Sequence, residues 1–176
     1  TGKRVLVVGS GISGVAATEL LKKQQIEVVL FDGNKNLDVE ALKQGLKEGV
    51  MEVISTDHAP HTEQEKDTIM QKAPFGIVGL ETAACLTYSE LVLGDIFTPM
   101  QMAAAMSYNP AKVMKMDKGD IQPGKVADIV IFDPNVTYKI DKTTFASKGQ
   151  NTPFHGYEVT GKVVGTICNG NIVFEA

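Results

Sequence analysis

EGVMEVISTDHAPHT, residues 48–62, joins a short apolar segment to a cluster of acidic and histidine side chains. Residues 50–56 predict a buried strand, because short apolar runs with β-branched residues are typical of strands covered on both faces. Such a strand would place Asp57 and His61 at the carboxyl edge of a sheet, where α/β folds usually bind ligands. Carboxylate and imidazole groups bind divalent cations, so the cluster indicates a metal site. The alternative is a hydrogen-bonded turn in which Asp57 caps backbone N–H groups and His61 is solvated.

Upstream of this stretch, residues 4–8 and 27–31 predict two more buried strands, separated by a glycine loop and a helical pattern. The loop has the spacing GxGxxG and contains Gly9, Gly11 and Gly14. Glycines at this spacing permit a tight turn and let a diphosphate approach the backbone at the start of the helix. Asp32 follows the second strand, where an acid can accept a hydrogen bond from a ribose. The loop therefore predicts nucleotide binding, and a glycine turn that serves only packing is the alternative.

Downstream, the sequence predicts helices and then a β-rich end. Apolar spacing indicates helices over residues 38–49 and 80–91. Two more helix starts are expected at Thr98-Pro99 and Asn109-Pro110, where a capping residue precedes a proline. Strands are expected over residues 126–132 and 163–174, the second as a hairpin around Asn169-Gly170. A mobile surface loop with a short helical turn is expected over residues 62–72.

The fold class is therefore α/β. Strands at residues 4–8, 27–31 and 50–56, linked by right-handed crossovers, predict a three-stranded parallel sheet whose first βαβ unit is Rossmann-like.

Composition excludes several classes of protein. The chain has 176 residues, a net charge of −4 and no long basic run, so we expect neither a nucleic-acid nor a membrane partner. No apolar run reaches the roughly 18 residues of a membrane helix. Two distant cysteines, Cys85 and Cys168, do not form a disulfide framework, which fits a cytoplasmic protein. Because the chain begins with Thr1, we expect a fragment or a processed product.

The first part of the chain resembles a ligase family. KRVLVVGSGISGVAATELL (3–21) and EVVLFDGN (27–34) are similar to the N-terminus of UDP-N-acetylmuramoyl-L-alanine:D-glutamate ligase, over about the first 36 residues. This resemblance implies a UDP-type site formed by Gly9, Gly11, Ile12, Ser13, Gly14 and Asp32. The family's ATP-binding loop, GxxxxGK[ST], is missing from the sequence, so we do not expect ligase chemistry.

The rest of the chain, residues ~40–176, resembles the C-terminal third of dihydroorotase. The segments that carry this resemblance are residues 48–62, KAPFGIVGLETA (72–83), MSYNPAKVM (106–114), KGDIQPGKVADIVIFDP (118–134) and FASKGQNTPFHGYEVTGKVVGTICNGNIV (145–173). Dihydroorotase is an amidohydrolase, so the resemblance implies a (β/α)8 barrel with zinc at the strand ends and a small β-sandwich. Its substrate is a small molecule, dihydroorotate or N-carbamoyl-L-aspartate, from pyrimidine biosynthesis.

The resemblance implies roles for individual residues. Asp57 matches the aspartate that binds metal and acts as general base and acid. His61 matches the histidine that contacts the substrate carboxylate, and the backbone of Phe75 and Gly76 matches the loop that touches the pyrimidine ring. His58 is expected to shape the turn.

The family's zinc site also uses an HxH pair, a carboxylated lysine and two further histidines, all before the aspartate. The chain has three histidines, and none matches a metal-binding one. A lone aspartate cannot hold Zn²⁺ in the three-ligand arrangement of a catalytic site. We therefore expect a remnant of a metal site that does not bind zinc in full and is inactive alone, unless another chain supplies the other ligands.

Together the resemblances predict a chimera with a junction between Gly33 and Gly49. Its segments would be residues 1–36, of Rossmann-like nucleotide-binding type, residues 37–119, from the dihydroorotase barrel, and residues 120–176, from the β-sandwich. The sandwich segment lacks partner strands, so we expect exposed edges and possible self-association. Three functions stay open: an amidohydrolase segment, a nucleotide-binding module, and a structural chimera without activity.

Overall fold

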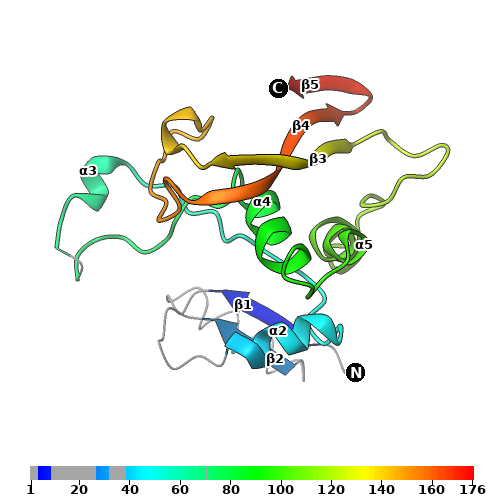
Figure 1. The fold of residues 1–176 in the computed structure, drawn as a ribbon, viewed down its shortest axis with the longest axis horizontal. Coiled ribbons are helices and arrows are strands. Elements are labelled where there is room, and N and C mark those ends of the chain that lie inside the picture. Colours follow the sequence, from blue (N-terminus) through cyan, green and yellow to red (C-terminus); the bar gives the residue numbers. More distant parts are fainter. Residues whose placement is uncertain (1–3, 9–26, 32–38, 70) are drawn as a thin grey trace. The chain divides into compact units, whose positions relative to one another are not determined.

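A computed structural model of the chain describes residues 4–8, 27–31, 39–69 and 71–176 (Figure 1). The chain divides into two compact units. The first unit comprises Thr1–Met51, Ser55–Ala83 and Lys139–Tyr157, and the second comprises Glu52–Ile54, Ala84–Tyr138 and Glu158–Ala176. Both units are discontinuous in sequence. The division into segments 1–36, 37–119 and 120–176, which concerns ancestry, stays a prediction.

The first unit contains a two-stranded parallel sheet. Strand β1 (Arg4–Val8) pairs with β2 (Glu27–Phe31) in the register that places Val5 opposite Val28. The strands lie where the apolar runs predict them. The Rossmann-like unit is not shown, because the connection between the strands lies outside the described residues.

The predicted third strand at residues 50–56 is wrong, because no strand forms there. The backbone N–H of Ile54 donates to the carbonyl of Ala105 (3.0 Å), and the carbonyl of Glu52 accepts from the Asn109 amide (2.7 Å). Backbone groups that would pair with a neighbouring strand thus bond to a helix instead. Within the described ranges the parallel sheet has two strands, not three.

The helices of the first unit are short. Helix α2 (Val39–Lys47) lies in the predicted range, and Gly49 follows it with a positive φ of 71°, as expected of a glycine that ends a helix. Helix α3 (Glu63–Lys66) is a single turn, capped by Thr62 in a capping box with Glu65. A 3₁₀ turn, η3 (Lys142–Thr144), follows much later in the sequence.

Two longer helices belong to the second unit. Helix α4 (Ala83–Thr87) continues into the π-helical η1 (Tyr88–Val92), close to the helix predicted over 80–91. Helix α5 (Pro99–Ala103) continues through the π-helical η2 (Ala104–Tyr108) into α6 (Asn109–Val113). Thr98 caps α5 as predicted, with its side chain accepting from the N–H of Gln101.

Helix α6 begins at Asn109, where a start is predicted, but the expected cap is wrong, because α6 continues directly from η2. Pro110 lacks the N–H of an ordinary helical bond, and the π-helical turn before it widens the backbone where that bond is missing. The Asn109 side chain does not cap the helix but donates to the carbonyl of Glu52.

A three-stranded sheet in the order β3–β4–β5 completes the second unit (Figure 1). Its strands are β3 (Ile129–Lys139), β4 (Glu158–Cys168) and β5 (Asn171–Glu175), and β4 and β5 are antiparallel. Asn169 and Gly170 connect them with φ values of 48° and 78°, so the predicted hairpin turn is confirmed.

Helix η1 packs on the sheet of the second unit at a glycine. The rings of Tyr88 and Phe132 lie 5.2 Å apart, and a Cβ on Gly161 would come within 2.3 Å of the Phe132 ring. Next to this contact, the Ser89 hydroxyl accepts from the Thr160 N–H (2.8 Å). Buried apolar side chains of this unit include Cys85, Phe97, Ala105, Ala111 and Val159. No helix in the described part of the chain is long and apolar enough to cross a membrane.

Candidate functional site

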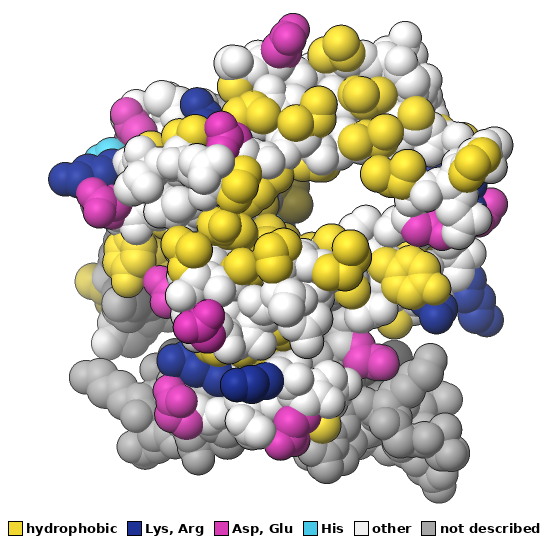
Figure 2. Space-filling model, turned by 45° about the vertical axis from the view of Figure 1, so that its right-hand side comes forward, with side chains coloured by type: hydrophobic (Ala, Val, Ile, Leu, Met, Phe, Trp, Pro, Cys, Tyr) yellow, Lys and Arg dark blue, Asp and Glu magenta, His cyan; other side chains and the backbone are white. Residues whose placement is uncertain are grey.

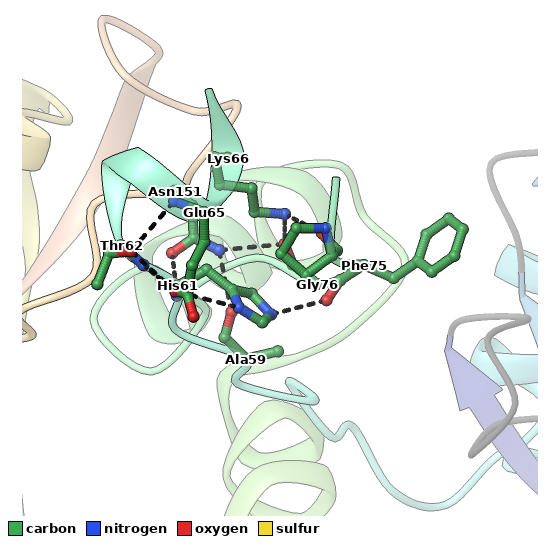
Figure 3. A network of polar contacts seen from close by, with 9 residues as sticks. Ala59, His61, Thr62, Glu65, Lys66, Phe75, Gly76 and Asn151 are labelled. Atoms are coloured by element: carbon green, nitrogen blue, oxygen red, sulfur yellow. Dashed lines mark hydrogen bonds and ion pairs between the residues drawn. The ribbon is translucent and has the colours of Figure 1, made fainter. Parts of the chain in front are cut away.

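The predicted site residues of the dihydroorotase-like part lie in the first unit, where three segments distant in sequence meet. They are residues 57–62, residues 74–79 and the turn around Asn151 (Figure 3). The Ala59 N–H donates to the Ile77 carbonyl (2.9 Å), and His58 and Ile77 form an isolated parallel bridge. The first two segments therefore run side by side, as a short pairing of two loops.

His61 contacts the segment that the resemblance assigns to the same site. Its ring Nε2 lies 3.0 Å from the Phe75 carbonyl oxygen, a contact in which the ring nitrogen donates. Its Nδ1 lies 3.8 Å from a carboxylate oxygen of Glu65. His61, Phe75 and Gly76 are thus brought together, while the Phe75 ring points away from them and Phe75 is 83% exposed (Figure 3).

Glu65 connects this histidine to the cap of α3. Its carboxylate accepts from the backbone N–H of Thr62 (2.8 Å) and from the Thr62 hydroxyl (2.9 Å). These hydrogen bonds, first the backbone one, lower the pKa of Glu65, with a smaller contribution from the nearby His61. A carboxylate is therefore kept ionised beside the imidazole ring.

Asp57 occupies an unusual backbone conformation at the start of the same segment. Its φ is +44°, in the left-handed region that non-glycine residues seldom adopt. Its side chain is exposed and accepts no hydrogen bond from the described residues. This arrangement differs from the capped turn considered as the alternative, in which the carboxylate would be bonded to backbone N–H groups. Backbone strain of this kind is common at functional sites.

His58 has a structural role in the loop pairing. Its Nδ1 accepts from the Gly79 N–H (3.1 Å), and a Cβ on Gly79 would lie 3.0 Å from the Thr56 side chain. The ring thus fixes the turn that follows Asp57, in line with the role expected for it.

Two residues that no sequence motif singled out hold the site together. Asn151 donates to the carbonyls of Ala59 and Gly76 and accepts from the His61 N–H. Lys66 donates to the carbonyls of Pro74 and Gly76. Asn151 lies in a segment that carries the dihydroorotase resemblance, but the pattern alone gave no reason to choose it over its neighbours.

The donor set does not fit a zinc centre. The described residues contain no group of three or more His, Cys, Asp or Glu side chains placed to hold a metal ion. A catalytic zinc site needs three protein ligands, and Asp57 contributes a single carboxylate. The described residues of this chain alone therefore do not supply the ligands of a catalytic zinc ion.

The residues of the glycine loop lie outside the described part of the chain. They are Gly9, Gly11, Ile12, Ser13, Gly14 and Asp32. Nucleotide binding by this loop therefore stays a prediction.

Comparison with known proteins places most of the chain in one family. The sequence model of the amidohydrolase family matches residues 9–173. The dihydroorotase of Pelotomaculum thermopropionicum is 49% identical over 138 residues, which cover 78% of this chain and 32% of that protein. The dihydroorotase of Bacillus subtilis is 46% identical over 138 residues, which again cover 78% of this chain and 32% of that protein. The chain thus spans about a third of the length of these curated relatives.

Solved structures give the same architecture. A dihydropyrimidinase from Brevibacillus agri has a TM-score of 0.77 at 24% identity and covers 98% of this chain, which corresponds to 45% of that protein. A D-hydantoinase from a Bacillus sp. AR9 has a TM-score of 0.73 at 26% identity. The match covers 99% of this chain and 46% of the D-hydantoinase chain. The family match begins at Gly9, inside the segment that resembles the ligase. None of these comparisons supports the ligase resemblance or a chimera.

Proposed function

The chain belongs to the amidohydrolase family, and from this membership we propose that it is part of a dihydroorotase-like cyclic-amide hydrolase. The observation that carries the proposal is an identity of 45–49% to dihydroorotases over 138–139 residues. The contact of His61 with the Phe75 carbonyl supports it, because two residues that are expected to contact the same substrate lie together. The reaction opens the ring of dihydroorotate by adding water across one amide C–N bond, which gives N-carbamoyl-L-aspartate.

Each site residue has a proposed role. The Asp57 carboxylate takes a proton from the attacking water and returns it to the leaving nitrogen. His61 donates to the substrate carboxylate, and the backbone of Phe75 and Gly76 contacts the ring. In the whole enzyme zinc would activate the water, but its other ligands are missing from this sequence, so the chain alone is inactive.

An assay of the purified chain with added Zn²⁺ tests inactivity. We expect no conversion of dihydroorotate above the uncatalysed rate, and elemental analysis should give far less than one zinc ion per chain. Turnover that disappears in Asp57→Ala would contradict the assignment of inactivity.

Ligand binding tests the site itself. In an NMR titration with L-dihydroorotate, we expect resonances of His61 and Gly76 to shift, and His61→Ala to abolish the shift of Gly76. His155→Ala is the matched control, since His155 is exposed and lies near Asp141 in the turn at η3. Equal responses of both variants would argue against a substrate site at His61.

A further inference from the structure

Resting on the proposed function, we propose that Asn151 and Lys66 are positioning residues that fix the distance between His61 and the Phe75–Gly76 peptide (Figure 3). Neither residue belongs to the loops 57–62 or 74–79 that would contact the substrate. Both act on the carbonyl oxygen of Gly76, to which Asn151 donates at 3.1 Å and Lys66 at 2.7 Å.

Asn151 uses all three hydrogen-bonding capacities that this arrangement needs. Its amide nitrogen donates to the Ala59 carbonyl (2.9 Å) and to the Gly76 carbonyl (3.1 Å). Its amide oxygen accepts from the His61 N–H (2.9 Å). One planar side chain therefore bridges both loops and holds the backbone of His61 itself. Only an amide offers donors and an acceptor at these positions, because a carboxylate lacks the donors.

Lys66 holds the loop of residues 74–79. It precedes this loop in the sequence, whereas Asn151 follows it. Lys66 ends α3, and its ammonium group donates to the Pro74 carbonyl (2.6 Å) and to the Gly76 carbonyl. These bonds are charge-assisted and therefore stronger than neutral ones. Since α3 is capped by Thr62, next to His61, the same short helix connects both sides of the site.

Gly76 explains why such a clamp is needed. Its φ is +116°, and a Cβ at this position would lie 2.3 Å from the Ala59 Cβ. The peptide thus approaches the other loop closely in a conformation that other residues avoid. By holding the Gly76 carbonyl, the two side chains help to keep the neighbouring Phe75 carbonyl 3.0 Å from the His61 ring.

The first test replaces the donors of Asn151 without changing its size. Asn151→Asp keeps an acceptor for the His61 N–H but opposes two carbonyl oxygens with a carboxylate. In the labelled full chain, we expect changed ¹⁵N shifts of the His61 ring and loss of the coupling across its hydrogen bond to Phe75. Asn171→Asp is the matched control, because the Asn171 amide donates only to the nearby Asn169 carbonyl.

The second test uses Lys66, whose charge can be removed without a large change in length. We expect Lys66→Met to alter the His61 ring shifts and to weaken L-dihydroorotate binding about tenfold, the loss of roughly one charge-assisted bond. Lys66→Arg keeps donors for both carbonyls and should restore the ring shifts and most of the affinity.

Unchanged His61 ring shifts in both Asn151→Asp and Lys66→Met would overturn the positioning role, even if these variants melt at a lower temperature. Altered ring shifts together with no dihydroorotate binding by the unmodified chain would support the clamp and overturn the proposed function. The ring signature is read without ligand, so the two failures are distinguishable.

Discussion

Gly76 is where the backbone geometry of the candidate site is most demanding. We expect Gly76→Ala to lower the free energy of unfolding by about 2–4 kcal/mol, because it adds both a positive-φ penalty and a clash with Ala59. Gly156 has a φ of +80°, and a Cβ there would meet no heavy atom within 4 Å, so Gly156→Ala should cost only about 1 kcal/mol. Urea unfolding of both variants measures the difference, and equal losses would show that close approach contributes nothing.

Asp128 contributes to folding stability in a way that is lost at acidic pH. Its carboxylate accepts from the Asn169 N–H (2.8 Å) and pairs with Lys118, and these contacts, the backbone bond first, lower its pKa. A lowered folded-state pKa contributes stability above the ordinary value of about 3.9, and this contribution is lost as pH falls through the folded pKa. Asp128→Asn should therefore be less stable than the unmodified chain at pH 6, with a difference that shrinks towards pH 2–3.

Urea midpoints at several pH values measure this effect. Glu175→Gln, which removes a carboxylate at the exposed end of β5, is the control. A difference in stability between Asp128→Asn and the unmodified chain that stays constant from pH 6 to pH 2 would contradict this role of the Asp128 carboxylate.

Individual site residues were predictable only where the sequence carried a resemblance. His61 and Phe75 were named from the matching motif, and the structure brings them into contact. Asn151 was not named, because its three partners lie 75 to 92 residues away and no local pattern reports such contacts. The sequence predicts a mobile surface loop around Lys66, whereas the ammonium group of this residue donates to two backbone carbonyls.

Helix α5 begins where its capping residue and proline predict a helix start. Thr98 and Gln101 form a capping box on either side of Pro99, and all of its parts are close in sequence. We expect Thr98→Ala to lower the free energy of unfolding by about 1 kcal/mol, while Thr98→Ser keeps the hydroxyl and most of the stability. Thermal or urea unfolding checks this, and equal losses in both variants would indicate that the cap contributes nothing.

Elements that depend on distant partners were predicted less well. The segment over residues 50–56 has the composition of a strand, but a strand needs a neighbour in the sheet. Its backbone instead bonds to the helix that contains Ala105 and Asn109. The hairpin at Asn169-Gly170 was predictable because turn residues and both strands are contiguous.

At the scale of the whole molecule, exposed apolar side chains mark the last strand of the second unit. Every residue of β5 is exposed, and this strand ends the order β3–β4–β5. Ile172, Val173 and Phe174 are 70%, 61% and 47% exposed. Hydrophobic side chains are visible at many places on the face drawn in Figure 2. An apolar edge strand is a template for pairing with another chain.

We therefore predict that the purified chain self-associates with increasing concentration, through β5. Ile172→Lys should shift sedimentation velocity profiles towards the monomer, because a charge on an edge strand opposes pairing and desolvation. Gln122→Lys adds the same charge in an exposed loop and should leave association unchanged. A chain that stays monomeric at all accessible concentrations, or that both substitutions affect equally, would show that β5 is not the surface through which copies meet.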